Sequence, residues 1–238
     1  MTTETISTNS STTTRGVVRW LIRETMGIVM AALILFLCAN RWDWLWGWAT
    51  VIVLALWVGA TALTVIPTHP ELLAERRGPR KGAKTWDTAL MSIVGVIILT
   101  VYVVGGLDVR YGWTIGFPVA AQIAGVILAV LGYALFVWAT ASNAFFSQIV
   151  RIQKERGHSV ATGGPYKFVR HPGYVGSILA YVGTPIILGS GWAILLGVVS
   201  VILMIVRTVL EDKTLLTELD GYQAYAARVR YRLLPGVW

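Results

Sequence analysis

Residues 172–206 read PGYVGSILAYVGTPIILGSGWAILLGVVSVILMIV, and this run of 35 residues contains no charged side chain. A hydrocarbon core about 30 Å thick needs roughly 20 helical residues, so the run is too long for one crossing. The tripeptide Gly-Ser-Gly at 189–191 interrupts it, with Pro185 just before, and glycine permits a tight turn. We therefore predict a helical hairpin, the first helix of which is short.

Four further apolar runs precede this hairpin. They are Thr25–Asn40, Trp44–Thr68, Thr88–Leu107 and Tyr111–Val150. The last run has 40 residues, about twice the length of one span, so its helix either projects beyond the bilayer or begins after Pro118. Together the runs predict an all-α integral membrane protein with about six transmembrane segments, the fifth and sixth forming the hairpin. An even number of crossings places both termini on one side.

The composition agrees with a membrane protein. Charged residues make up 13% of the chain and the mean hydropathy is +0.66, whereas a soluble domain carries nearer 25% charged residues. Cys38 is the single cysteine, which excludes an intramolecular disulfide and a cysteine-based metal site. Residues 1–14 contain ten Ser or Thr residues, and we predict a disordered tail there. Residues 15–142 then form the N-terminal transmembrane helices.

The basic residues are distributed unequally between the two sides of this topology. One side carries 18 of the 20: Arg15, Arg19, Arg23, Arg76, Arg77, Arg80, Lys81, Lys84, Arg151, Lys154, Arg156, Lys167, Arg170, Arg207, Lys213, Arg228, Arg230 and Arg232. Only Arg41 and Arg110 fall on the other side. The positive-inside rule predicts that the basic side, with both termini, is cytoplasmic. The rule also explains the net charge of +8 without nucleic acid as a partner.

The polar residues favour an enzyme over a transporter or channel. Polar side chains are scarce in the middles of the first four segments and concentrate in residues 148–174 and 207–238. Arg207 and Glu211 are four apart and share a helix face. A plain helix salt bridge is one interpretation, but the cation precedes the anion, which is the less favourable order. Arg207 also ends a long apolar run, so we favour a functional site at the membrane boundary.

The loop before residue 172 contains His158 and His171. They lack carboxylates at ligand spacing, so we predict no metal site. Hydrogen-bond donors in a polar pocket and solvated loop histidines are both compatible with their spacing. The sequence also lacks a phosphate-binding glycine loop and a G-x-S-x-G elbow, so neither a common nucleotide fold nor a serine hydrolase is supported.

Three sequence blocks resemble the isoprenylcysteine carboxyl methyltransferase family, which is related to membrane phospholipid methyltransferases. They are His158-Ser-Val-Ala-Thr-x-Gly-Pro-Tyr-x-x-x-Arg-His-Pro-x-Tyr-x-Gly176, Arg207-x-x-x-Glu-Asp-x-x-Leu215, and Tyr222-x-x-Tyr-x-x-x-Val229 with Pro235. The resemblance covers residues 143–236, while the first four segments match only in hydropathy. The chain has Asp212, Asp220 and Arg230 where the family commonly has Glu, Gly and Pro, which puts a contact from Asp212 to the cofactor in doubt.

The resemblance implies an S-adenosylmethionine-dependent methyltransferase whose catalytic region, residues 143–238, forms a cytoplasmic cofactor pocket. The implied cofactor-binding residues are Gln148, His158, Gly164, Tyr166, His171, Pro172, Tyr174 and Glu211. The implied catalytic residues are Arg207 and Glu211, with the Arg207 guanidinium orienting an acceptor carboxylate through its paired donors.

The resemblance favours carboxyl methylation of a prenylcysteine-like substrate, so the partners are a lipophilic or lipidated substrate and membrane lipids. A phospholipid-type N-methyltransferase is the alternative, as is an NADPH-dependent reductase of the related sterol reductase fold. A membrane scaffold without catalytic activity is a third class. The resemblance to the compact form of the family implies a prokaryotic plasma membrane.

Overall fold

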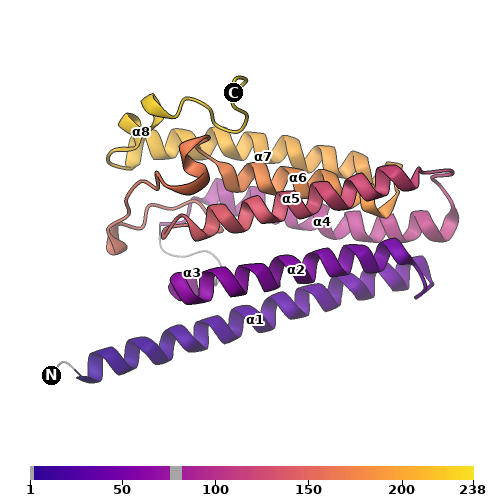
Figure 1. The fold of residues 1–238 in the computed structure, drawn as a ribbon, viewed down its shortest axis with the longest axis horizontal. Coiled ribbons are helices and arrows are strands. Elements are labelled where there is room, and N and C mark those ends of the chain that lie inside the picture. Colours follow the sequence, from indigo (N-terminus) through magenta and orange to yellow (C-terminus); the bar gives the residue numbers. More distant parts are fainter. Residues whose placement is uncertain (1–2, 76–81) are drawn as a thin grey trace.

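In the computed structural model, which describes residues 3–75 and 82–238, every regular element is helical (Figure 1). The α-helices are α1 (Thr3–Ala39), α2 (Leu45–Thr68), α3 (Pro70–Glu75), α4 (Thr85–Tyr111), α5 (Val119–Ala141), α6 (Pro172–Leu188), α7 (Gly191–Glu218) and α8 (Tyr222–Arg228). Two 3₁₀ turns, η1 (Lys154–Arg156) and η2 (Gly164–Lys167), lie in the loop between α5 and α6. The predicted all-α fold is confirmed.

Five of the described helices are long and apolar enough to cross a membrane: α1 over Thr13–Ala39, α2, α4, α5 and α7. Helix α6 is apolar but has only 17 residues. These six helices correspond to the six predicted segments. They lie roughly antiparallel in one elongated bundle, and the start of α1 lies at the same end as α8 (Figure 1).

The hairpin of α6 and α7 forms where the sequence predicts it. Gly189 caps α6 with φ 68°, a left-handed conformation that glycine adopts without a steric penalty. Ser190 caps α7, and its hydroxyl accepts a hydrogen bond from the Ala193 amide at 3.1 Å. Upstream, α5 begins directly after Pro118, which decides between the two alternatives for the 40-residue run.

The N-terminal tail differs from the prediction. Helix α1 begins at Thr3, so most of the segment for which we predicted disorder is helical. Residues 3–15 contain neither glycine nor proline, so no residue in this stretch breaks the helix that the apolar segment starts.

Helices α5 and α6 approach each other closely through glycines. A Cβ on Gly132 would lie 2.6 Å from the carbonyl oxygen of Gly176, and one on Gly176 would lie 2.5 Å from that of Gly132. Gly125 and Gly183 make a second contact of this kind two turns further along. Small residues of this sort let membrane helices pack backbone to backbone. This packing fixes the first turns of α6, where Tyr174 lies.

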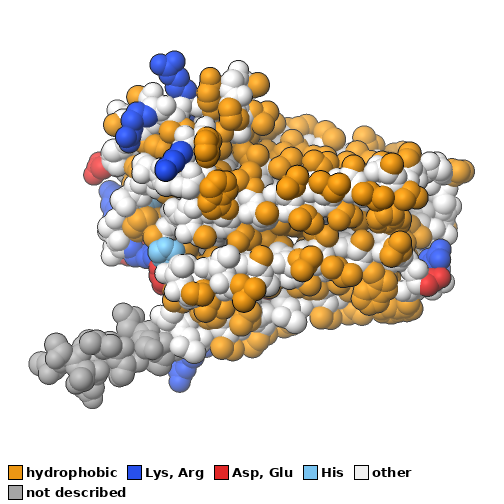
Figure 2. Space-filling view, in the orientation of Figure 1, with side chains coloured by type: hydrophobic (Ala, Val, Ile, Leu, Met, Phe, Trp, Pro, Cys, Tyr) orange, Lys and Arg blue, Asp and Glu red, His pale blue; other side chains and the backbone are white. Residues whose placement is uncertain are grey.

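The two ends of the bundle carry different charges. On the face shown in Figure 2, Lys and Arg side chains gather at the end that carries α8. We call this the basic end; it includes the loop between α5 and α6. At the opposite end, Arg41 binds Asp43 through two hydrogen bonds of 2.9 and 3.0 Å. The side of the bundle between the ends is largely hydrophobic (Figure 2), as expected for a surface in contact with lipid.

Candidate active site

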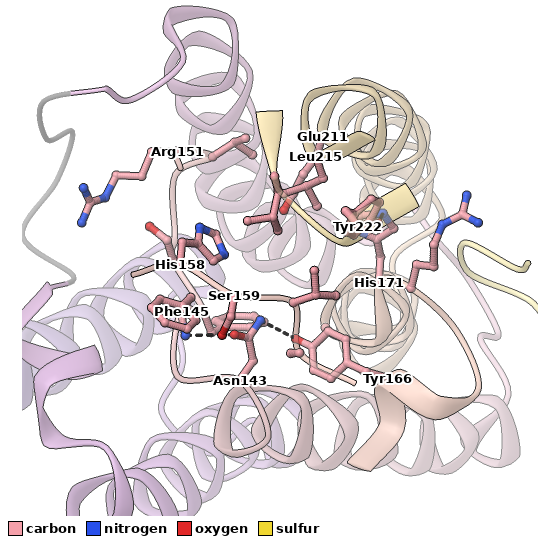
Figure 3. A pocket seen from close by; sticks show the side chains of 18 of the residues that line it. Asn143, Phe145, Arg151, His158, Ser159, Tyr166, His171, Glu211, Leu215 and Tyr222 are labelled. Carbon is pink, nitrogen blue, oxygen red and sulfur yellow. Dashed lines mark hydrogen bonds between the residues drawn. The ribbon is translucent and has the colours of Figure 1, made fainter. Parts of the chain in front are cut away.

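A pocket lies at the basic end, between the loop of residues 142–171 and the last turns of α7 (Figure 3). Aromatic rings make up much of its wall: Phe145, Phe146, Tyr166, Tyr174, Tyr222 and Tyr225. The Asn143 amide donates a hydrogen bond of 3.3 Å to the Tyr166 hydroxyl, which orients that ring at the pocket edge (Figure 3). We call this the aromatic pocket.

The structure brings five of the predicted site residues together in the aromatic pocket. They are His158, Tyr166, His171, Tyr174 and Glu211. They come from the loop, from the start of α6 and from α7, so segments more than 50 residues apart in sequence form one wall. Their convergence is the arrangement that the resemblance implies.

The other predicted residues lie around the aromatic pocket. Gly164 has φ 52° and no room for a side chain against Ser142, and Pro172 is the first residue of α6. Both therefore shape the backbone of the loop. Gln148 and Arg207 line a second cavity, which adjoins the aromatic pocket.

Asp212 forms the largest polar cluster behind the pocket. Arg170 binds both carboxylate oxygens at 2.8 Å, and Arg232 donates to Oδ2 at 2.8 Å. The Tyr222 hydroxyl and the His171 Nε2 lie 2.8 and 3.1 Å from Oδ1. The carboxylate is fully buried and does not line the pocket. Asp212 therefore positions residues of the pocket wall.

The segment after α8 is clamped onto the loop by Arg170. The Arg170 and His171 amides donate to the carbonyl oxygens of Tyr231 and Arg232 at 2.9 and 3.0 Å. The Arg170 Nη1 donates to the carbonyl oxygen of Arg230 at 2.9 Å. The residues that end the chain thus hold the residues that begin α6, so the aromatic pocket depends on both.

Glu211 and Tyr174 are paired inside the aromatic pocket. The Tyr174 hydroxyl donates a hydrogen bond to Oε2 of Glu211. The Tyr174 ring also stacks on His171, with centroids 5.5 Å apart and planes at 7°. A carboxylate beside stacked rings suits a positively charged ligand.

The second cavity lies among the membrane helices and has a volume of about 420 Å³. It is lined mainly by apolar and aromatic side chains of α1, α2, α4, α5, α6 and α7. Phe146, Ser147, Ile149 and Tyr174 line both this apolar cavity and the aromatic pocket. A lipophilic ligand in one and a polar ligand in the other would therefore meet at these residues.

Arg207 lies where the apolar cavity approaches Tyr174, with its guanidinium carbon 4.9 Å from the ring centroid. Its Nε and Nη2 bind the two oxygens of Asp87 at 2.7 and 3.0 Å, and Nη2 also donates to the carbonyl oxygen of Gln148 at 2.7 Å. No ion pair between Arg207 and Glu211 occurs in the described part of the chain. The plain helix salt bridge is therefore absent.

Asp87 is a site residue that the sequence reasoning missed. It is a fully buried carboxylate in the first turn of α4, directly before the apolar run Thr88–Leu107. An acidic residue at this membrane boundary could have indicated a buried ion pair, because a buried carboxylate requires a partner. The partner lies 120 residues away in sequence, so no local pattern identifies it.

His158 is held in its neutral form. Burial, followed by the charges of Arg151 and Arg156, lowers the pKa of His158 to about 4. Its Nδ1 accepts a hydrogen bond from the Gln153 amide at 3.2 Å, and its ring stacks on Phe145 with centroids 4.7 Å apart. A neutral imidazole at this position offers hydrogen bonds without adding a positive charge to the pocket.

Residues 120–219 of the chain match the family model for phospholipid methyltransferases. This stretch runs from the start of α5 to the end of α7 and contains the loop, Tyr174, Arg207 and Glu211. The matched class is therefore that of membrane methyltransferases, and the match includes all the residues that line the aromatic pocket except Tyr222 and Tyr225.

Individual relatives carry a more specific name. Two rice proteins (Oryza sativa subsp. indica and subsp. japonica), each named probable protein-S-isoprenylcysteine O-methyltransferase, are 32% identical over 65 residues, 27% of this chain. A Schizosaccharomyces pombe protein-S-isoprenylcysteine O-methyltransferase is 42% identical over 45 residues, 19% of this chain. The chain spans 34% of the length of the rice relatives and 19% of the yeast relative. These matches confirm the resemblance noted in the sequence.

Proposed function

We propose that this protein is an integral membrane methyltransferase that transfers a methyl group from S-adenosylmethionine to a lipophilic acceptor. The observation that carries the proposal is the contact between the aromatic pocket and the apolar cavity at Tyr174. A polar methyl donor and an apolar acceptor need separate sites that share one boundary.

The residues of the aromatic pocket fit S-adenosylmethionine. Its sulfonium is a cation, and the aromatic rings of Tyr166 and Tyr222 in the pocket wall attract cations. Glu211 offers a carboxylate to its ammonium or ribose groups, and neutral His158 offers hydrogen bonds to the same ligand. When bound, S-adenosylmethionine supplies an electrophilic methyl group.

The chain itself aligns the reactants and excludes water. In-line displacement needs the acceptor atom, the methyl carbon and the sulfur in one line, and correct alignment supplies much of the rate enhancement. Tyr174 forms part of the wall between the two sites, and its hydrogen bond to Glu211 fixes the position of its ring. Phe146 and Ile149 line the same junction with apolar surface, which disfavours water.

Two acceptor classes follow from the resemblance. A prenylcysteine-like carboxylate is already nucleophilic and needs no base, and Arg207 would orient it. A phospholipid amine must lose a proton first, and Glu211, which is hydrogen-bonded to Tyr174 at the junction, would be the base. We further propose that the basic end faces the cytoplasm of a prokaryotic cell, since the basic residues gather there.

Calorimetry in detergent tests the proposed cofactor. S-adenosylmethionine and its demethylated product should both bind wild type, and binding should weaken in Glu211→Gln and in His171→Ala. Titration with NADPH distinguishes a reductase, since a methyltransferase should not bind it in this pocket. Failure of S-adenosylmethionine and its product to bind wild type would contradict the proposal. If NADPH also failed to bind, a membrane scaffold without catalytic activity would be favoured.

A further inference from the structure

Asp87 brings the N-terminal half of the chain into the site. It lies on α4, outside the stretch 120–219 that matches the family model. Its carboxylate is fully buried and the Arg207 side chain is 5% exposed. Because both carboxylate oxygens bind the guanidinium, the charge of Arg207 is matched before any acceptor arrives.

The Asp87 carboxylate is held in place by a further donor. The Val150 amide donates to Oδ2 at 2.7 Å, and the Val150 carbonyl oxygen accepts from the Lys84 amide at 3.0 Å. If the carboxylate turned away, the guanidinium and the amide would both lose a buried partner, which is costly. Asp87 therefore stays bound to Arg207 when an acceptor enters.

The charges around Tyr174 favour one kind of acceptor. Arg207 contributes one positive charge, while Asp87 and Glu211 contribute one negative charge each. No ion pair of Glu211 occurs in the described part of the chain. Of the other arginines near the loop, Arg170 and Arg232 are bound to Asp212, and Arg151, which lines the aromatic pocket, is bound to Glu155. An acceptor carboxylate would therefore meet no unmatched positive charge beside Tyr174, whereas an ammonium group could pair with Glu211.

We propose that Asp87 is a specificity-determining residue. By neutralising Arg207, it makes the site select lipophilic acceptors with a basic amine over acceptors with a free carboxylate. This inference rests on the proposed function and names its acceptor class. In the described part of the chain no hydrogen bond involves Nη1 of Arg207, so this group is available to an uncharged oxygen of the same acceptor.

The chemical step balances for an amine. The ammonium group gives one proton to the carboxylate of Glu211. The nitrogen lone pair then forms the new N–C bond, and the C–S bond breaks with its electron pair on sulfur. The acceptor nitrogen gains the positive charge that the sulfonium loses.

The test compares two acceptors in one assay with methyl-labelled S-adenosylmethionine. The first is phosphatidylethanolamine and the second is an S-prenylated N-acetylcysteine. We expect wild type to show the larger kcat/KM for the amine. Asp87→Asn preserves the shape of the side chain and releases the charge of Arg207. It should raise kcat/KM for the carboxylate relative to the amine at least tenfold, mainly by lowering KM for the carboxylate.

Two further variants separate charge from structure. The double variant Asp87→Asn/Arg207→Gln carries the same net charge as wild type and should return the acceptor ratio toward that of wild type, even if its rate is low. Asp108→Asn alters another buried aspartate of α4, 3% exposed and bound to Thr114 and Ser190 at the opposite end. It should change stability without changing the ratio.

The outcomes distinguish this inference from the proposed function. A wild type that prefers the carboxylate, or an unchanged ratio in Asp87→Asn with cofactor binding intact, overturns the role of Asp87 alone. A wild type that binds no S-adenosylmethionine and methylates neither acceptor overturns the proposed function as well. If Asp87→Asn does not fold, the ratio measured for the double variant and for wild type decides the question: a preference for the carboxylate in either one overturns the inference.

Discussion

The molecule contains two fully buried aspartates at its basic end, Asp212 and Asp87, and they are used differently. Each binds an arginine through both carboxylate oxygens. Asp212 additionally contacts a second arginine, a histidine and a tyrosine, whereas Asp87 has one arginine and one backbone amide. Asp212 therefore joins several segments, and Asp87 matches a single charge.

The difference shows how one fold can use a buried aspartate either to hold chain segments together or to set the charge of a binding site. Substitution of a buried carboxylate with several cationic neighbours is strongly destabilising, because its removal leaves more than one charge without a partner. A buried carboxylate with one arginine leaves the net charge of its site adjustable by a single substitution. The first arrangement suits a scaffold, and the second suits a residue that sets specificity.

The strongest test of this contrast is Asp212→Ala. Arg170 and Arg232 would lose their shared carboxylate, and we expect a stability loss of about 3–5 kcal/mol together with loss of S-adenosylmethionine binding. Thermal unfolding in detergent and calorimetry measure the two effects. Asp220→Ala, an exposed aspartate eight residues further on, is the matched control and should resemble wild type. A stable Asp212→Ala variant that binds the cofactor would refute the scaffold role.

Removal of the other aspartate should cost less. Asp87→Ala leaves one guanidinium and the Val150 amide without their carboxylate, and we expect a loss of about 3 kcal/mol, the lower end of the range for broken buried pairs. Cofactor affinity should fall only a few-fold, since Asp87 does not line the aromatic pocket. The same two measurements apply, with Thr88→Ala as control. A larger loss of stability in Asp87→Ala than in Asp212→Ala would contradict the proposed difference between the two aspartates.

Glu211 binds neither Asp87 nor Asp212 and lines the aromatic pocket, so its substitution should affect binding without affecting the fold. Glu211→Gln preserves the size of the side chain and removes its charge, so S-adenosylmethionine should bind about tenfold more weakly, equivalent to roughly 1.4 kcal/mol. The unfolding temperature should stay within about 2 °C of wild type, because a change well below 1 kcal/mol shifts it by no more than that. Glu218→Gln on the same helix removes a half-exposed pair with Lys84 and should bind the cofactor normally.

Substitution of His158 should have the smallest of these effects at neutral pH, and its effect on stability should depend on pH. Its pKa in the folded protein is about 4, below the ordinary value of 6.5, so the folded state takes up the proton less readily than the unfolded chain. The contribution of neutral His158 is complete above pH 6.5 and is lost as the pH falls from 6.5 toward 4. Unfolding temperatures across pH 4–8 for wild type and His158→Gln should converge on acidification. A constant difference between them would show that protonation of His158 has no role.

Much of the fold could be predicted because its signals are local. The turn at Gly189 and the start of α5 after Pro118 follow from residues that restrict or permit particular backbone angles. The site residues in the loop belong to a contiguous motif, and five of the eight implied cofactor residues line one pocket.

The rest depends on contacts between distant parts of the chain. The partner of Arg207 could not be predicted because Asp87 lies 120 residues away, and the sequence alone offered Glu211 on the same helix face. The role of Asp212 was missed for a similar reason, since its partners Arg170 and Arg232 come from opposite sides of it in the sequence. Charge pairing in a buried site is decided by the packing of the helices.

The clamp between Arg170 and the segment after α8 has a consequence for biosynthesis. The carbonyl oxygen that accepts from Arg170 belongs to Arg230, which is synthesised 60 residues later. At typical elongation rates of 5–20 residues per second, this interval lasts about 3–12 s. The long helices leave the ribosome before the aromatic pocket can close, so the growing chain enters the membrane before this pocket is complete.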